Sequence, residues 1–200
     1  MTECCIPAGH PPAAVEIARN KLLTRERLRD TDLLVPWFFP TSFSADPAAL
    51  AGMVAFPCMI KPVIPTGGRG VTRVDDGPSF VRVFQELRGL LASVEFSSEA
   101  DEDRSTALVE GYVDGLEFVL AGTMRHGTFN ASSLYDVEGA LPPAVSQAPD
   151  DMRKDIEQAV SRATAAMGLR DGTVQVQCMV TDRGVYVLDV SLERWRRAPV

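Results

Sequence analysis

The sequence predicts an α+β fold in which helices pack on antiparallel sheets. Two segments, Pro78 to Leu91 and Asp150 to Met167, have apolar residues at the spacing of amphipathic helices. Two later runs, 117–123 and 128–135, alternate apolar and polar residues as half-buried strands do. Between them, Arg125-His126-Gly127 is suited to a tight turn, which joins antiparallel neighbours. We therefore expect His126 to lie in solvent.

The composition is that of a globular chain. Its 200 residues are 46% hydrophobic and 24% charged, enough for one domain or two small lobes. The net charge of −7 argues against nucleic acid as a partner, because phosphate backbones are bound by clustered Lys and Arg. There is no apolar run of eighteen residues and no signal-peptide pattern, so we expect no membrane partner.

The four cysteines do not form a zinc or disulfide pattern. Cys4 and Cys5 are adjacent, Cys58 and Cys178 lie singly in apolar runs, and none has CxxC spacing. With only two histidines in the chain, a zinc site is not indicated. This pattern suits a reducing compartment, so we expect a cytoplasmic protein.

The N-terminal half predicts a helix followed by short strands. Residues 13–29 have helical spacing, and Thr24 is placed to act as a second N-cap. The proline-rich run 35–40 favours an edge strand. The apolar run 56–62 indicates a buried strand, and 71–74 its returning partner in a hairpin.

The loop between these two strands contains a candidate phosphate site. It reads Pro65-Thr66-Gly67-Gly68-Arg69-Gly70, and Lys61 ends the strand before it. Glycines allow backbone N–H groups to approach phosphate oxygens, while a lysine on a strand supplies compensating charge. The loop has neither the Walker pattern nor the dinucleotide fingerprint. Taken alone, the loop is better explained as an ordinary hairpin with a lysine at its base.

The order of the surrounding segments is more specific. Asn20-Lys21, Phe56 to Pro62, Gly67 to Val71 and the run Leu108-Val109-Glu110-Gly111-Tyr112-Val113-Asp114-Gly115-Leu116-Glu117-Phe118 follow one another over most of the chain. In this order and spacing the sequence resembles the ATP-grasp superfamily of carboxylate–amine and carboxylate–thiol ligases.

The resemblance implies two α+β lobes whose antiparallel sheets enclose a nucleotide cleft. A helical lead-in would span residues 1–35, a smaller lobe 36–109 and a larger, incomplete lobe 110–200. It also implies ATP and Mg²⁺ as ligands. The activity would be ATP-dependent ligation of small carboxylate and amine substrates through an acyl phosphate. The family's N-terminal domain and C-terminal end have no counterpart here, and the oligomeric state stays open.

The resemblance also assigns residues to the nucleotide. Lys21 and Lys61 would contact phosphates, with the glycines of the loop covering them. The run from Glu110 to Val113 would follow the adenine edge, and Glu117 would accept from the ribose hydroxyls. The nucleotide-binding residues implied are Lys21, Lys61, Gly67, Gly68, Gly70, Glu110, Gly111, Val113, Glu117 and Met179. On the residues alone, Lys21 is better explained as an exposed helix lysine, and Glu110 and Glu117 are equally ordinary polar strand positions.

The implied metal site departs from the family pattern. Gln177 stands where the first acidic ligand is expected, and Asp189 replaces a glutamate by a shorter carboxylate. Glu193 stands where an arginine is usual. Magnesium prefers anionic oxygens, so a neutral amide compensates less for dehydration of the ion. The alternative function is therefore a degenerate nucleotide-binding or interaction module, or a fragment without ligase activity.

Overall fold

The computed structural model describes residues 9–64, 70–93, 105–137 and 144–192. The chain divides into two compact units. The smaller unit is formed by Asn20–Leu22 and Pro36–Val113. The larger unit is formed by Met1–Arg19, Leu23–Val35 and Asp114–Val200.

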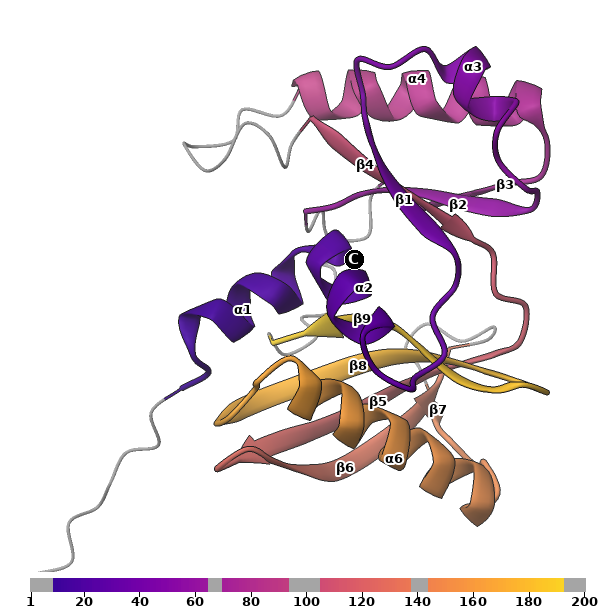
Figure 1. Ribbon diagram of the computed structural model, residues 1–200. Coiled ribbons are helices and arrows are strands. Elements are labelled where there is room, and N and C mark those ends of the chain that lie inside the picture. Colours follow the sequence, from indigo (N-terminus) through magenta and orange to yellow (C-terminus); the bar gives the residue numbers. More distant parts are fainter. Residues whose placement is uncertain (1–8, 65–69, 94–104, 138–143, 193–200) are drawn as a thin grey trace, which may run out of the picture. The chain divides into compact units, whose positions relative to one another are not determined.

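The smaller unit is a four-stranded antiparallel sheet with two helices. Its strands are β1 (Phe38–Ser42), β2 (Cys58–Pro62), β3 (Thr72–Val74) and β4 (Thr106–Gly111), in the order β1-β4-β2-β3. The helices are α3 (Pro47–Ala51) and α4 (Gly77–Ser93), both on one face of this sheet (Figure 1). As expected, the hairpin of β2 and β3 forms and the proline-containing β1 lies at an edge, although β1 begins only at Phe38.

One face of the four-stranded sheet is covered by α3 and α4, and the side chains buried there show which strand residues lie on the opposite face. Phe80 and Phe84 of α4 stack with ring centroids 5.9 Å apart and pack against Ile60 and Val109 of the sheet. Successive strand residues point to opposite faces. Lys61, next to Ile60, is therefore carried on the face away from α4.

The larger unit is built on a five-stranded antiparallel sheet. Its strands are β5 (Leu116–Arg125), β6 (Thr128–Asp136), β7 (Ala144–Val145), β8 (Gly172–Thr181) and β9 (Gly184–Ser191), in the order β7-β6-β5-β8-β9. The helices are α1 (Pro12–Arg19), α2 (Lys21–Arg29), whose first residues belong to the smaller unit, and α6 (Asp150–Ala166).

Helix α6 lies along one face of the five-stranded sheet (Figure 1). Ile156, Val160 and Ala163 repeat along it at helical spacing and are fully buried in a core with Leu120 and Val176. Fully burying a side chain the size of Ile156 or Val160 stabilises the fold by about 1.5–3 kcal/mol. The predicted stripe of α6 is thus confirmed, and it determines which face of the sheet is core.

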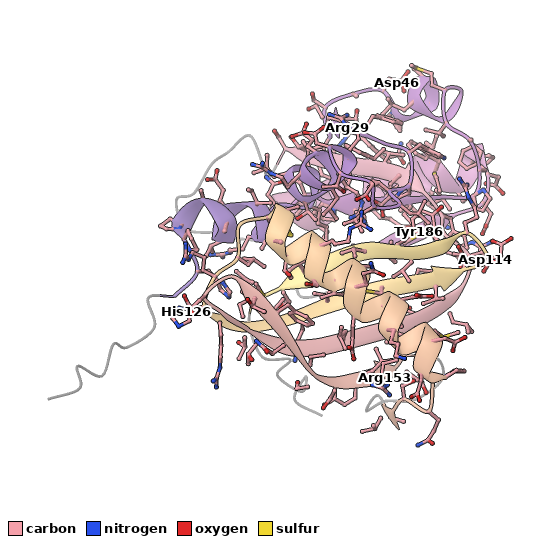
Figure 2. All side chains as sticks on the ribbon, turned by 60° about the horizontal axis from the view of Figure 1, so that its bottom comes forward. Arg29, Asp46, Asp114, His126, Arg153 and Tyr186 are labelled. Carbon is pink, nitrogen blue, oxygen red and sulfur yellow. The ribbon has the colours of Figure 1, made fainter. Side chains whose placement is uncertain are left out.

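Three local features bear on the sequence predictions. The helix expected over 13–29 is divided at Asn20, whose side-chain oxygen accepts from Leu22 N at 3.0 Å and so begins α2. Thr24 is instead buried, and its hydroxyl donates to Ile17 O at 2.7 Å. Figure 2 shows His126 at the tip of the β5–β6 hairpin, with its side chain 86% exposed as expected. The short strand β7 was not expected from its proline-rich surroundings.

Candidate functional site

In the smaller unit, β2 and β4 bring Lys61 and Glu110 into an ion pair. Lys61 lies opposite Leu108, and Glu110 lies two residues farther along β4, so the two side chains share a face. Both are buried, with 6% of Lys61 and 2% of Glu110 exposed, and the ammonium contacts the carboxylate directly. The sequence predicted both residues as ligand contacts but did not predict that they would contact each other.

This pair is costly to keep unless both members are present. Burial removes the water that would solvate each charge, and only a close opposite charge offsets that loss. The ammonium at the end of β2 is therefore held in a fixed place by Glu110. The geometry suits phosphate recognition by Lys61.

Lys21 is anchored just beyond the end of β2 through its backbone. Its N–H donates to Val63 O at 2.8 Å, just beyond Lys61 in the chain. Asn20, which begins the helix, is itself 8% exposed. The first turn of α2 is thus anchored beside the end of β2, and the two predicted phosphate-binding lysines belong to the same compact unit.

The glycine loop is only partly described. Gly67 and Gly68 lie within residues 65–69, outside the described part of the chain. Gly70 has φ of 83°, and a Cβ placed on it would come 2.6 Å from Leu87 Cδ2. Glycine is needed at this position both for backbone conformation and for packing.

The strand end from Glu110 to Val113 is fixed by neighbouring backbone. Gly111 N donates to Trp37 O at 2.9 Å, and Tyr112 N donates to Pro57 O at 3.2 Å. A Cβ on Gly111 would lie 2.7 Å from the indole nitrogen of Trp37, so the side chain is excluded by packing. Gly111 therefore has a structural role in addition to the nucleotide contact predicted for it.

In the larger unit, register places four predicted residues on one sheet face. Glu117 of β5 lies opposite Met179 of β8, Val119 opposite Gln177, and Gln177 opposite Asp189 of β9. Residues opposite one another have side chains on the same face. The Gln177 amide also donates directly to the Glu117 carboxylate. Residues far apart in sequence thus form one polar row.

Asp189 reaches this face because β9 is irregular. Val187 lies opposite Cys178 and Asp189 opposite Gln177, which leaves Leu188 as an extra residue between them. The guanidinium of Arg25 donates to Val187 O at 3.2 Å and to Leu188 O at 2.7 Å. Sequence reasoning missed both the bulge and Arg25. The available signal was the spacing of the core valines, since Val190 breaks the alternation set by Val185 and Val187.

The donors on this face fit a magnesium ion only in part. Among residues 9–64, 70–93, 105–137 and 144–192, no group of three or more His, Cys, Asp and Glu side chains is arranged to hold a metal. Asp189 offers one carboxylate and Gln177 an amide oxygen. Magnesium is commonly held by one or two carboxylates together with substrate phosphates and water. These residues therefore suit an ion that arrives with a nucleotide better than a permanent metal site.

A pocket of about 340 Å³ lies next to Glu117 within the larger unit. Its wall includes Phe118, Asp136, Ala148 and Met152. Asp136 is a second carboxylate that the sequence analysis did not single out. Phe118 lies opposite Asp136 and belongs to the core against which Met152 packs, so the pocket lies toward α6 and not on the face that carries Gln177 and Asp189.

Comparison with known proteins identifies the family to which the chain belongs. The profile of the ATP-grasp domain matches residues 54–196, which include the strands from β2 to β9. The chain belongs to the ATP-grasp family. The α+β architecture with antiparallel sheets that the resemblance predicted is confirmed.

Its curated ATP-grasp relatives are much longer proteins. The carbamoyl phosphate synthase large chain of Renibacterium salmoninarum is 24% identical over 193 residues, covering 96% of this chain and 17% of the relative. The corresponding protein of Mycobacterium sp. (strain JLS) is 28% identical over 202 residues, with the same coverage. The chain thus spans about a sixth of the length of these relatives.

Solved structures share the ATP-grasp fold at low sequence identity. The L-amino acid ligase from Bacillus licheniformis superposes with a TM-score of 0.75 at 22% identity, covering 92% of this chain and 45% of that one. D-alanine–D-alanine ligase from Bacillus anthracis complexed with ATP gives 0.69 at 18% identity, covering 92% and 58%. None of the helices in the described part of this chain is long and apolar enough to cross a membrane.

Proposed function

We propose that this chain binds ATP as the nucleotide-binding part of an ATP-dependent carboxylate–amine ligase. The observation that carries the proposal is the buried Lys61–Glu110 pair at the end of β2. A fold gains little stability from a buried ion pair compared with apolar residues of similar volume, so its presence next to a glycine-rich loop favours a functional role.

The residues that the family resemblance implies are assigned unit by unit. From the smaller unit, Lys61 and Lys21 would bind phosphate oxygens, with Gly67, Gly68 and Gly70 over them, and Glu110, Gly111 and Val113 would line the adenine. From the larger unit, Glu117 would accept from the ribose and Met179 would pack on the base. Asp189 and Gln177 would hold Mg²⁺, which neutralises phosphate charge when bound.

The reaction in this proposal is formation of an acyl phosphate from a small carboxylate, followed by attack of an amine. The assignment rests on family membership and on the ligases that share the fold. Phosphoryl transfer depends chiefly on positioning and on neutralisation of the phosphates. In this chain a buried lysine and a row of polar residues on paired strands would provide the positioning. It has fewer anionic metal ligands than the family pattern, because Gln177 stands where an acidic residue is expected.

A second function is favoured by the row of Glu117, Gln177 and Asp189. The Gln177 amide donates a hydrogen bond to the Glu117 carboxylate, and the predicted metal-binding pair combines one amide, Gln177, with one acidic residue, Asp189. A site with one neutral ligand holds magnesium less firmly, which lowers turnover more than nucleotide affinity. The alternative is therefore a nucleotide-binding module that does not complete the ligase reaction.

Calorimetric ATP titration with and without Mg²⁺ tests the proposal. Lys61→Met should reduce ATP affinity about 10–100-fold, as expected for loss of a charge-assisted hydrogen bond worth about 1.5–3 kcal/mol. Because that variant leaves Glu110 buried without its cation, Lys61→Met combined with Glu110→Gln should be measured alongside it. Lys154→Met is the matched control, since Lys154 is exposed on α6.

Gln177→Glu separates the two functions. If the metal site limits a working ligase, a second carboxylate beside Asp189 should increase the effect of Mg²⁺ on ATP affinity and raise release of ADP with carboxylate and amine mixtures. If ADP release stays at background in the wild type and in Gln177→Glu while ATP still binds, the binding module is the function. Absence of ATP binding by the wild type, or equal binding by Lys61→Met, would contradict both.

A further inference from the structure

The side chains of β9 do not follow one alternation along the strand. Val185 and Val187 belong to the buried core of the larger unit. In a regular strand, residues two apart share a face, so Asp189 would enter the core with them. Instead Val190 is in the core, and Asp189 lies opposite Gln177 on the other face. The extra residue Leu188 accounts for this change.

Arg25 binds the backbone at that extra residue. It lies on α2, is fully buried, and donates to the carbonyl oxygens of Val187 and Leu188 at 3.2 and 2.7 Å. Leu188 has no partner in the register of β8 and β9. A bulge leaves backbone groups without ladder partners, and buried groups of that kind need another donor. The guanidinium supplies it from a neighbouring element.

We propose that Arg25 is a positioning residue for Asp189. It holds the bulge at Leu188, and the bulge carries the Asp189 carboxylate to the face shared with Gln177 and Glu117. This inference rests on the proposed role of Asp189 in holding the Mg²⁺ that accompanies ATP. It adds a residue in the larger unit, remote in sequence from β9, on which the metal dependence of binding relies.

The physical reason is that two backbone acceptors are fixed by one rigid donor. The planar guanidinium presents its N–H groups in a fixed fork, so consecutive carbonyls are held at a defined spacing. Loss of Arg25 would not turn Asp189 into the core, because burying an unpaired carboxylate there is unfavourable. Loss of Arg25 would leave the bulge without its side-chain donor, and the Asp189 carboxylate would occupy a wider range of positions. Ligands placed by such supporting contacts lose metal affinity when the support is removed.

Arg25→Gln tests the inference through the ratio of ATP affinities with and without Mg²⁺. We expect this ratio of ATP affinities to fall about 10-fold, toward the ratio measured for Asp189→Asn, because loss of a supporting contact weakens metal binding by about that factor. ATP affinity without Mg²⁺ should stay within about twofold of the wild type, the range of independent sites. Arg27→Gln is the matched control, an exposed arginine two residues along the same helix. Equal losses with and without Mg²⁺ would show that Arg25 acts on the nucleotide or on the fold, and would overturn the inference.

Deletion of Leu188 gives a second, rescuing test. Without that residue, Val187 and Asp189 can oppose Cys178 and Gln177 in a regular ladder, with Asp189 on the same face. In this background Arg25→Gln should no longer reduce the effect of Mg²⁺. If the substitution has the same effect with and without Leu188, Arg25 does not act through the bulge.

Hydrogen exchange separates this inference from the proposed function, because it needs no ligand. Backbone amides from Val187 to Val190 should exchange faster in Arg25→Gln than in Arg27→Gln, while the β5–β6 hairpin is unchanged. Protection of β9 equal in the two variants would overturn the inference whatever the protein binds. If exchange is faster in Arg25→Gln but ATP binding by the wild type does not depend on Mg²⁺, the metal role proposed for Asp189 is contradicted instead.

Discussion

The two sheets hold their polar residues in different ways. Around Lys61 and Glu110, β2 pairs with β4 in an uninterrupted register, and the two charges are buried against each other. Around Gln177 and Asp189, the register of β8 and β9 shifts, and the polar row is only partly buried. The first arrangement depends on charge pairing in a regular ladder, and the second on an irregularity held from outside the sheet. Stability should therefore respond strongly to changes in the first and weakly to changes in the second.

The largest effect is expected from Glu110→Ala. It would leave the Lys61 ammonium buried without a partner and lower the free energy of unfolding by about 3–5 kcal/mol. Glu117→Ala, in the partly exposed row of the larger unit, should cost about 1 kcal/mol. Urea unfolding of both variants measures the difference. Similar losses of unfolding free energy in the two variants would contradict the difference proposed between the two sheets.

A smaller effect is expected from Gly111→Ala in the smaller unit. The new methyl group would collide with Trp37, and overpacking of this kind costs about 1–3 kcal/mol. Gly89→Ala on α4 is the control, because a Cβ there meets nothing within 4 Å and alanine favours a helix by about 0.5–1 kcal/mol. Thermal melts followed by tryptophan fluorescence compare the two. A stabilised Gly111→Ala variant would show that Trp37 can move aside.

The smallest expected difference between the sheets is in the alkylation of two buried thiols, Cys58 and Cys178, one in each sheet. Burial raises the pKa of Cys58 to about 11 and that of Cys178 to about 12. Near neutral pH almost no thiolate is present, so alkylation should require opening of the unit that holds each thiol.

Labelling across a urea series, followed by peptide mapping in a Cys4→Ser, Cys5→Ser background, reports the two openings separately. Because the pKa of both thiols is raised on folding, their contribution to stability is intact below about pH 9 and falls as the pH rises toward 11 and 12. Rapid labelling of either thiol in native protein at pH 7 would contradict their burial.

Periodicity predicted most of the fold because burial enforces it. The stripe on α6, the β5–β6 hairpin and the buried strand that ends near Lys61 all follow from apolar spacing. The break between α1 and α2 was displaced because Asn20 and Thr24 are both common caps, and tertiary burial of Thr24 decided between them.

The candidate site was less accessible to sequence reasoning. The contact of Lys61 with Glu110 depends on the pairing of β2 with β4, which are separated by helix α4 in the chain. The orientation of Asp189 depends on one extra residue, and a strict alternation would have placed it with the core valines. The roles of the nucleotide-binding residues themselves stay predictions, with Gly67 and Gly68 outside the described residues.

The extra residue in β9 also bears on how such a site can evolve. Insertion of one residue in a regular strand exchanges the faces of all residues beyond it, unless a bulge absorbs the extra residue. A carboxylate could thus keep its place in a ligand set when its strand gains a residue, provided that a neighbouring donor such as Arg25 accommodates the surplus carbonyl. A donor on another element would then let a strand change in length without changing the residues that face a site.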